Sequence, residues 1–259
     1  MSELVSVLMP IAPRSAWLGQ AVSSLIAQTH QDWLLVAVLD GECDQNRAVL
    51  QQPQLSGRIR VKVVPPGSGV ARALNTGLEA SSTELVARFD SDDVCEPERL
   101  RTQIAEMRAR PELVVLGSSA TVIDERGRKI GVLSVPVGPE RVRRQLLWRN
   151  AVIHPSAVLR REQVLRAGGY DPTFVRAQDY ELWLRMSRRG LLDNLASPLL
   201  RYRRHSQQHS RPITEPAETM QLRLARRRAA GSHPGRVALS DARHFAWLTV
   251  QHVKAWQRG

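Results

Sequence analysis

The chain has 259 residues, 42% of them hydrophobic and 24% charged, and a formal net charge of +12. This size and composition predict a globular protein with one main domain and a short extension. No apolar run approaches the roughly eighteen residues of a membrane span, and the first ten residues lack a secretory signal. Two cysteines, Cys43 and Cys95, allow no disulfide framework and are expected to be buried thiols. We therefore expect a cytoplasmic protein.

The positive charge is concentrated at the end of the chain, because residues 201–259 carry nine of the twelve net charges. Such a segment suits nucleic acid, anionic lipid headgroups or an anionic substrate, and charge alone does not separate these partners. A solvated basic helix is the plain structural interpretation. A second hypothesis is peripheral docking on an anionic membrane. The residues that suggest docking are Trp247, Trp256, Arg243, Lys254 and Arg258.

Taken in chain order, apolar β-rich runs alternate with helical periodicity through the first half. Strands are predicted at 4–9, 33–39, 59–64, 84–89 and 113–116, with helices at 18–26, at 69–80 and from about 97 to 107. The run at 33–39 has little polar alternation, which indicates a strand buried on both faces. This order predicts a doubly wound, mostly parallel sheet with helices on both sides, an α/β fold of the Rossmann-like class.

After residue 116 the alternation ends. A polar hairpin turn is predicted at 124–128, helices at 139–148 and 179–188, and extended segments at 154–160 and 199–204. Beyond Ser210 the pattern is that of an Arg-rich helix with a break at 231–235. We expect a domain at 1–210, with halves at 1–116 and 117–210, and a basic helical extension at 211–259.

Acidic residues follow two of the predicted strands. Asp90, Ser91, Asp92 and Asp93 come directly after the fourth strand. Ligands of such sheets bind beyond the carboxyl ends of the strands. Clustered carboxylates repel one another unless a cation joins them, and Mg²⁺ or Mn²⁺ held by carboxylates completes its shell with phosphate and water. The cluster therefore predicts a metal and a phosphorylated ligand. The alternative is a capping cluster that opens the next helix.

Two further positions suit a nucleotide. Asp40 ends the second strand, where its carboxylate can accept hydrogen bonds from a base or ribose, or form a simple Asp-Gly turn with Gly41. The helix that begins at Gly69 offers free backbone N–H groups, and Arg72 adds a fixed charge. Both features are suited to bracing a nucleotide.

Nine sequence blocks between about Val5 and Ser210 resemble, in order, the inverting family 2 glycosyltransferases with the GT-A fold. They are SVLMP, VLDGECD, GVARALNTGL, ELVARFDSDD with PERLRTQ, PELVVLGSSATVID, HPSAVLR, AGGYDP, AQDYELWLRMSRRG and YRRHSQQHS. The resemblance is greatest to bacterial members that build surface polysaccharide, lipopolysaccharide or capsule. It implies transfer of a sugar, with inversion, from a nucleotide-diphosphate sugar, foremost a UDP-sugar, to a glycan or lipid-linked acceptor.

The resemblance also implies roles for individual residues. Asp90 and Asp92 would hold Mn²⁺ or Mg²⁺ with His205 nearby, and Asp93 extends the pair. Asp179, at the head of a helix, would be the general base. Nucleotide-sugar contacts are implied for Pro10, Asp40, Arg72, Asp90, Ser91 and Asp92, and acceptor contacts for His154 and Gln178. Taken alone, Asp179 also fits a helix cap and His205 a structural histidine.

These roles fit a direct displacement at the anomeric carbon, which needs a base for the acceptor hydroxyl and a cation for the leaving diphosphate. The chain departs from the family pattern at three places. Ala12 and Pro13 stand where Tyr-Asn is frequent, and Leu39 replaces the first of two aspartates. Gln178 replaces a glutamate beside the base, and without that like charge Asp179 should be less basic.

Three alternatives remain open from the sequence. Residues 90–94 fit the D-x-D-x-V signature of haloacid-dehalogenase-type phosphatases, although two strand-helix units precede them. A sugar-1-phosphate nucleotidyltransferase would share the sheet, but the loop after the first strand has only Arg14 as a basic residue. A non-enzymatic nucleic-acid binder would explain the charge, but no array of stacking aromatics accompanies it. We therefore expect no nucleic-acid partner.

Overall fold

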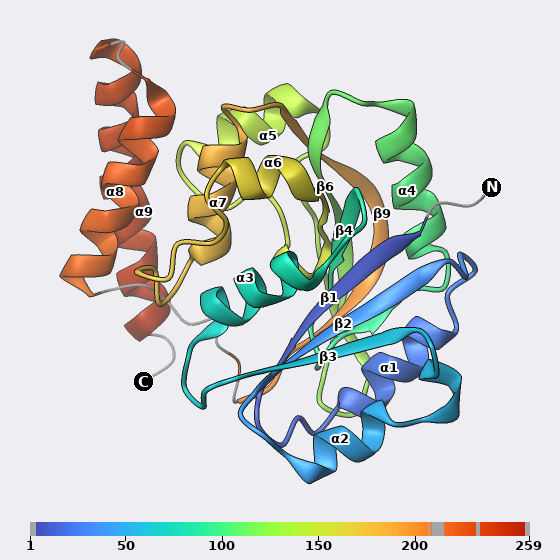
Figure 1. The fold of residues 1–259 in the computed structure, drawn as a ribbon. Coiled ribbons are helices and arrows are strands. Elements are labelled where there is room, and N and C mark those ends of the chain that lie inside the picture. The colour runs from blue at the N-terminus through green and yellow to red at the C-terminus, as the bar shows by residue number, and fades with distance from the viewer. Residues whose placement is uncertain (1–3, 207, 209–214, 232–233, 257–259) are drawn as a thin grey trace.

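The computed structural model describes residues 4–206, 208, 215–231 and 234–256 (Figure 1). Its strands are β1 (Val5–Ile11), β2 (Trp33–Asp40), β3 (Ile59–Val64), β4 (Leu85–Arg88), β5 (Val94–Cys95), β6 (Leu113–Ile123), β7 (Lys129–Leu133), β8 (Val158–Arg160) and β9 (Leu191–Arg203). Its helices are α1 (Leu18–Ile26), α2 (Asp44–Leu50), α3 (Val70–Ala80), α4 (Arg99–Ala109), α5 (Pro139–Leu146), α6 (Arg161–Arg166), α7 (Gln178–Met186), α8 (Pro216–Ala230) and α9 (Pro234–Trp256), with 3₁₀ turns η1 (Pro53–Leu55) and η2 (His154–Ser156). The predicted boundary at Ser210 and the predicted docking residue Arg258 lie outside the described residues.

The strands form one nine-stranded sheet in the order β3-β2-β1-β4-β8-β6-β9-β5, with β7 paired to β6. β1 pairs in parallel with β2 and β4, β2 with β3, and β6 with β9. β8 is antiparallel to both β4 and β6, so β6 and β9 run in the same direction as β4. The sheet is therefore mixed. Its half that contains β1 to β4 is parallel, as the sequence predicted. The carboxyl ends of β1, β2, β4, β6 and β9 consequently share one edge.

Two apolar layers cover the sheet because successive side chains of a strand point to opposite faces. Val36 and Val38 of β2 pack with α3, α6 and α7 on one face. Leu35 and Leu39 of the same strand pack with α1 and α4 on the other. α3 approaches β1 closely at Gly77, where an added Cβ would lie 2.0 Å from Leu8 Cδ1. Both faces of the sheet are therefore core.

Several predicted elements end differently in the structure. β6 continues to Ile123 and β9 begins at Leu191, because the two strands pair with each other along most of their length. The segment predicted as extended from 154 begins with the 3₁₀ turn η2. The short elements α2, β5 and α6 were not predicted. Cys95 is buried as expected, whereas Cys43 is only half-buried, so the prediction for Cys43 was wrong.

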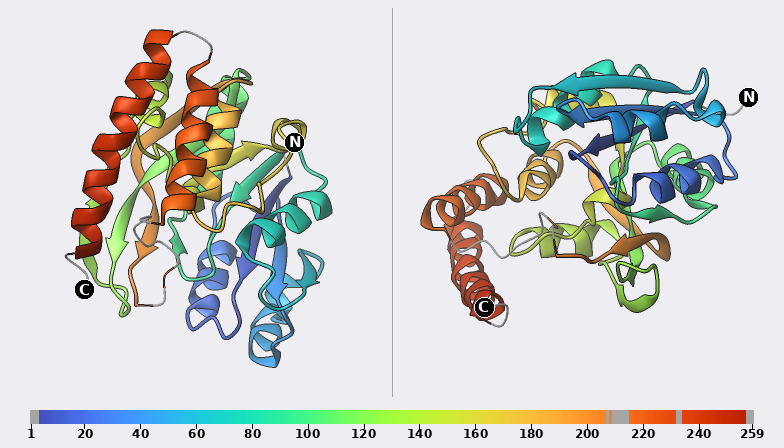
Figure 2. Two further views of the ribbon diagram at one scale, coloured as in Figure 1. Left: turned by 90° about the vertical axis from the view of Figure 1, so that its left-hand side faces the viewer. Right: turned by 90° about the horizontal axis from the view of Figure 1, so that it is seen from below.

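The basic C-terminal segment forms two helices, α8 and α9, that stand beside α7 at one side of the molecule (Figures 1 and 2). Arg226 of α8 is fully buried and donates to Tyr180 Oη of α7. The interpretation as a simply solvated helix was therefore wrong for the inner face of α8. Trp247 is also buried, so its predicted membrane contact was wrong. Trp256 and Lys254 belong to α9, but their side chains lie outside the described residues.

None of the helices among the described residues is both long enough and apolar enough to cross a membrane.

Candidate active site

Residues predicted to contact the nucleotide lie at the shared carboxyl edge of the sheet. Pro10 is next to last in β1, and Asp40 is the last residue of β2. Asp40 Oδ1 is buried and has no hydrogen-bond partner among the described residues. A buried carboxylate oxygen without a partner is costly, so this atom is suited to accept a hydrogen bond from a ligand.

The first turn of α3 lies at the same edge because α3 follows β3. Gly69 precedes the helix with φ +82°, a left-handed conformation that glycine adopts without strain. Arg72 is exposed in this first turn. Free backbone N–H groups and a guanidinium together favour an anion such as a diphosphate.

Three carboxylates meet where β4 ends. One oxygen from each of Asp90, Asp92 and Asp93 lies within 4.8 Å of the others. Asp90 Oδ1 is 2.6 Å from Arg88 Nη2, and Asp92 Oδ2 is 2.8 Å from His205 Nε2. Asp93 is buried and accepts the backbone N–H of Arg203 at 2.8 Å. Ser91 is buried between them and its hydroxyl accepts from Ser15 at 3.1 Å.

The electrostatics of this cluster favour a bound cation. Burial, followed by the charges of Asp92 and Asp90, raises the pKa of Asp93 well above its ordinary value. Burial and then Asp90 raise the pKa of Asp92, against the opposing effect of His205. Oxygen ligands at this spacing suit a hard divalent ion, which would relieve the repulsion. The cluster could therefore hold a metal.

Arg203 fixes the turn that carries the cluster, and sequence analysis missed it. It is fully buried, and its Nε donates to the Asp92 carbonyl at 2.8 Å. Its other nitrogens donate to the carbonyls of Asp124 and Glu125 in the β6–β7 hairpin and to Gln20 Oε1 of α1. The only sequence signal was its place two residues before His205.

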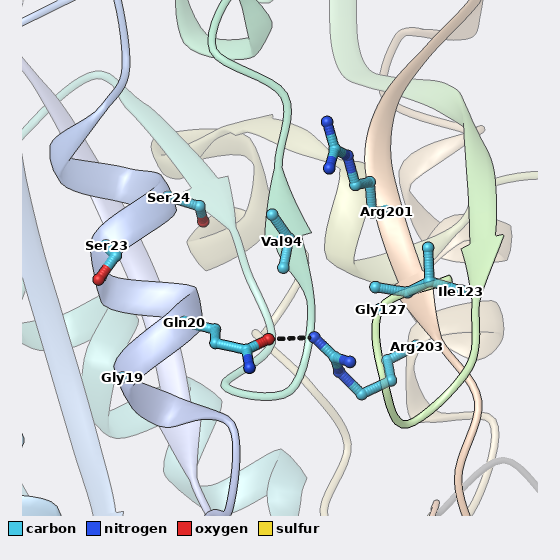
Figure 3. Close-up of a pocket in the computed structure, with 9 residues that line it drawn as sticks. All are labelled: Gly19, Gln20, Ser23, Ser24, Val94, Ile123, Gly127, Arg201 and Arg203. Atoms are coloured by element: carbon cyan, nitrogen blue, oxygen red, sulfur yellow. Dashed lines mark hydrogen bonds between the residues drawn. The ribbon is translucent and has the colours of Figure 1, made fainter. Parts of the chain in front are cut away.

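Arg203 also lines a cavity of about 500 Å³ (Figure 3). Gly19, Gln20, Ser23 and Ser24 of α1 line one wall, and Arg201 lies across from them. Figure 3 shows the hydrogen bond from Arg203 to Gln20, which joins two of the lining residues. None of the predicted donor residues lines this cavity. The carboxylate cluster and the cavity are therefore separate features of the same region.

Asp179 lies in the first turn of α7. It follows Ala177, which has φ +58°, an uncommon left-handed conformation for a residue with a Cβ, and the half-buried Gln178. Asp179 Oδ2 accepts a hydrogen bond from Asn150 Nδ2 at 2.7 Å. Burial raises the pKa of Asp179, against the Tyr180 N–H and the Asn150 amide, which lower it. A carboxylate with a raised pKa is a better proton acceptor.

Arg88 interacts with both the carboxylate cluster and Asp179, and it was also missed. Its side chain is 2% exposed, and its Nε and Nη1 have no partner among the described residues. Its positive charge lowers the pKa of Asp93 and also that of Asp179. Arg88 therefore connects the two acidic parts of the site electrostatically. In the sequence it is only a polar residue at the end of an apolar strand.

His154 is packed inside the protein beside this region. Its Nε2 is 2.8 Å from Tyr170 Oη, and its ring meets Trp183 edge-on at 5.8 Å. Burial, followed by the charge of Arg88, holds the pKa of His154 well below its ordinary value, so the imidazole is neutral. The acceptor contact predicted for His154 and Gln178 stays a prediction.

Solved structures share this fold. The chain resembles S. aureus TarS 1–349 in complex with UDP-GlcNAc, with a TM-score of 0.74 and 17% identity over 96% of this chain and 72% of that chain. TarS 1–349 in complex with UDP gives a TM-score of 0.71 at 15% identity, over 95% of this chain and 70% of that one. The GT-A-like architecture expected from the sequence is therefore confirmed.

Comparisons of the sequence with known proteins lead to the same family of enzymes. The amylovoran biosynthesis glycosyltransferase AmsE of Erwinia amylovora is 31% identical over 72% of this chain and 70% of its own length. The O-antigen biosynthesis glycosyltransferase WbnJ of Escherichia coli is 28% identical over 79% of this chain and 81% of its own. Residues 6–169 match the model of "Glycosyl transferase family 2". The phosphatase, nucleotidyltransferase and nucleic-acid-binding alternatives are thereby set aside, and the chain belongs to glycosyl transferase family 2 as a glycosyltransferase.

Proposed function

We propose that this glycosyltransferase transfers a sugar from a nucleotide-diphosphate sugar to an acceptor hydroxyl with inversion. The observation that carries the proposal is the shared sheet edge, where Asp40 Oδ1, unpartnered among the described residues, lies at the end of β2 and the Asp90–Asp92 carboxylates follow β4, with the parallel strand β1 between the two. A nucleoside at Asp40 would place its diphosphate toward the carboxylate cluster. We assign residues 1–116 to donor binding and 117–210 to acceptor binding on this basis.

A uridine nucleotide is the proposed donor carrier. Asp40 would accept from the nucleoside, Arg72 and the α3 N-terminus would brace the diphosphate, and Pro10 and Ser91 would line the same pocket. The fold it shares with TarS, whose structures include complexes with UDP and UDP-GlcNAc, supports this choice.

Asp90 and Asp92 are the proposed ligands of Mn²⁺ or Mg²⁺, with His205 at hydrogen-bond distance from Asp92. When bound, such an ion supplies positive charge that stabilises the leaving nucleotide diphosphate. His205 would hold Asp92 in one orientation, as groups behind metal ligands commonly do.

In the proposed reaction Asp179 takes the proton of the acceptor hydroxyl. The acceptor oxygen then forms a bond to the anomeric carbon, while the bond from that carbon to the diphosphate oxygen breaks and its electron pair leaves with the diphosphate. Asn150 orients the Asp179 carboxylate through the 2.7 Å hydrogen bond. Attack opposite the leaving group gives inversion.

A surface polysaccharide or its lipid-linked precursor is the proposed acceptor. Amylovoran and O-antigen biosynthesis are the processes named for the relatives AmsE and WbnJ. We place the reaction at the cytoplasmic side of the membrane, where nucleotide sugars are available.

Nucleotide binding tests the proposal most directly. Calorimetry with UDP, GDP, CDP and dTDP, with and without Mn²⁺, should give metal-dependent binding, strongest for UDP. Asp40→Asn should weaken UDP binding by about tenfold, the usual effect of losing one charged hydrogen bond. Asp32→Asn is the matched control, because Asp32 is exposed and directly precedes β2, at the end of the strand opposite to Asp40. No binding of any nucleotide with metal present would refute the proposal.

A second experiment separates the base from the binding site. Asp179→Asn keeps the shape of the side chain, so UDP and Mn²⁺ binding should stay unchanged while sugar transfer falls by at least a hundredfold. Loss of both nucleotide binding and transfer would mean that Asp179 is structural. Proton NMR of the product's anomeric signal would test inversion.

A further inference from the structure

The outward side of α9 is apolar over more than three turns. Within 238–250, a stretch that the structure describes completely, the exposed positions are Ala238, Leu239, Ala242, Phe245, Ala246, Thr249 and Val250. Their spacing of three and four residues makes them one continuous helical face. Phe245 is 55% exposed, Leu239 48% and Val250 44%. We call these seven residues the outer face.

Arginines border the outer face on both sides. Arg227 of α8 is exposed and lies 3.8 Å from Asp241, and Arg228 beside it is exposed as well. On the opposite side Arg243 of α9 donates to the carbonyl of Arg144 in α5, whose own side chain is largely exposed. Asp241 is the acidic residue of this stretch, and Arg223 already pairs with it at 3.0 Å. The border is therefore net positive.

α8 extends the same surface. Met220 and Leu224, one helical turn apart, are 49% and 43% exposed, and they share the outward side of α8 with Arg227 and Arg228. Exposed apolar side chains grouped in this way, with a charged rim, mark surfaces that contact something else.

The inner side of the two helices is firmly attached to the rest of the molecule. Arg226 binds Tyr180 Oη of α7 at 2.8 Å and His244 Nδ1 of α9 at 2.9 Å, and the ring of Trp247 lies 4.4 Å from its guanidinium. The outer face is consequently held on a fixed support. Whatever binds it is oriented relative to α7, the helix that begins at Gln178 and carries Asp179 in its first turn.

We propose that the outer face of α9, with its arginine border, docks this glycosyltransferase on an anionic lipid bilayer. An apolar helical face with basic flanks matches the interface of such a membrane, where apolar side chains enter the headgroup boundary and arginines meet lipid phosphates. Nucleic acid would instead require charges within the face. A second copy of the chain in a two-fold arrangement would bring the arginine borders of the two copies together, which is unfavourable.

Docking of this kind would bring α7 near the bilayer surface and so give Asp179 access to an acceptor carried on a lipid. This last step rests on the proposed function. The docking itself does not, because it depends only on residues of α5, α8 and α9 that have no part in the proposed reaction.

Vesicle binding by the full chain tests the proposal. In flotation assays the chain should bind vesicles of equal parts phosphatidylcholine and phosphatidylglycerol, bind phosphatidylcholine vesicles much less, and be released by salt. Leu239→Ser with Phe245→Ser should lower the partition coefficient by about tenfold or more, since each half-exposed side chain loses its apolar burial. Arg227→Gln with Arg228→Gln should lower it by about fivefold per charge.

Matched controls remove similar groups elsewhere. Ile130 and Val132 of β7 are 56% and 51% exposed, so changing both to Ser removes as much exposed apolar surface. Arg101 and Arg166 are 67% and 63% exposed, so changing both to Gln removes the same charge from α4 and α6. Both controls should bind vesicles like the unchanged chain. Equal losses in the controls and the outer-face variants would overturn the proposal.

Two further measurements separate the remaining outcomes. Ala246→Glu changes an exposed alanine to a good helix former, so it should leave unfolding unchanged and still abolish vesicle binding. Sedimentation velocity should find the unchanged chain monomeric. A dimer that Phe245→Ser dissociates, with vesicle binding unaffected, would assign the face to a second copy instead. UDP binding measured on each variant keeps a failure of docking distinct from a failure of the proposed function.

Discussion

Replacing the buried Arg226 tests how the C-terminal helices are attached. The side chain is fully buried, donates to Tyr180 Oη and His244 Nδ1, and lies against the ring of Trp247. Its third nitrogen, Nη2, has no partner among the described residues. The group therefore both stabilises the packing and carries a cost of desolvation. The change from Arg to Met separates the two effects, because Met has a similar length and no charge.

For Arg226→Met, the stabilising interactions that are lost and the desolvation cost that is removed nearly cancel. The change removes two charge-assisted hydrogen bonds, worth about 1.5–3 kcal/mol each, and a desolvated cation–π contact worth about 2 kcal/mol. It also removes the desolvation cost of a buried guanidinium, which is several kcal/mol. We therefore expect the free energy of unfolding to change by less than about 2 kcal/mol. Arg226→Ala also leaves a cavity, which adds about 2–5 kcal/mol of destabilisation.

The pH dependence gives a second test of the same contact. Burial, followed by the charge of Arg226, lowers the pKa of His244 from 6.5 to about 4. Because the folded pKa is the lower one, the unfolded chain binds the proton first. The contribution of neutral His244 to stability is therefore present above pH 6.5 and lost as the pH falls toward 4. Arg226→Met removes one cause of this shift, so its loss of stability in acid should be smaller.

Urea unfolding followed by tryptophan fluorescence, at about pH 7 and about pH 5, measures both effects. At neutral pH the free energy of unfolding should be similar for the unchanged chain and Arg226→Met, and clearly lower for Arg226→Ala. If Arg226→Met were as unstable as Arg226→Ala, or lost more stability in acid than the unchanged chain, the reasoning about desolvation and about His244 would be refuted.

Three other changes follow from single contacts. Asn150→Ala removes a hydrogen bond that lowers the pKa of Asp179, so the acid limb of the pH–rate profile should move to higher pH and kcat should fall about tenfold. Gly77→Ala should destabilise by about 1–3 kcal/mol in urea unfolding, because its Cβ would overlap Leu8; an unchanged midpoint would contradict this. Arg203→Lys loses the planar fork and should weaken Mn²⁺-dependent UDP binding at least tenfold in calorimetry, with the fold intact by circular dichroism.

The donor half of the molecule was largely predictable because its signals are local. Apart from the short elements α2 and β5, each strand and helix of residues 4–109 is visible in the spacing of apolar residues, and parallel strands bring their carboxyl ends to one edge. That rule alone put Asp40 and Asp90 at the same edge. The rule does not extend beyond β4, since β8 runs antiparallel and its short length, from Val158 to Arg160, leaves almost no periodic pattern.

The contacts that complete the site join residues far apart in the sequence. Arg203 and Asp92 are separated by 111 positions, and Asn150 and Asp179 by 29. No spacing rule relates such pairs. Arg88 illustrates the difficulty best, because a charged residue in an apolar strand predicts an edge or a break. The burial of Arg88 is explained by its ion pair with Asp90 at 2.6 Å, which the structure shows and the sequence does not.

Four positions of α9 are placed opposite to what hydropathy predicts. Hydropathy would bury Leu239 and Phe245 and expose Ser240 and His244, whereas the structure buries Ser240 and His244 and exposes the other two. The cause is Arg226, because a buried guanidinium requires an acceptor and an aromatic face, and His244 and Trp247 on the inner side of α9 supply them. With Ser240 and His244 turned inward beside Trp247, Leu239 and Phe245 are left on the outward side. The apolar outer face is thus a consequence of how the inner side is attached, and a monomer in water gains nothing from it, which is the physical reason to expect a binding surface there.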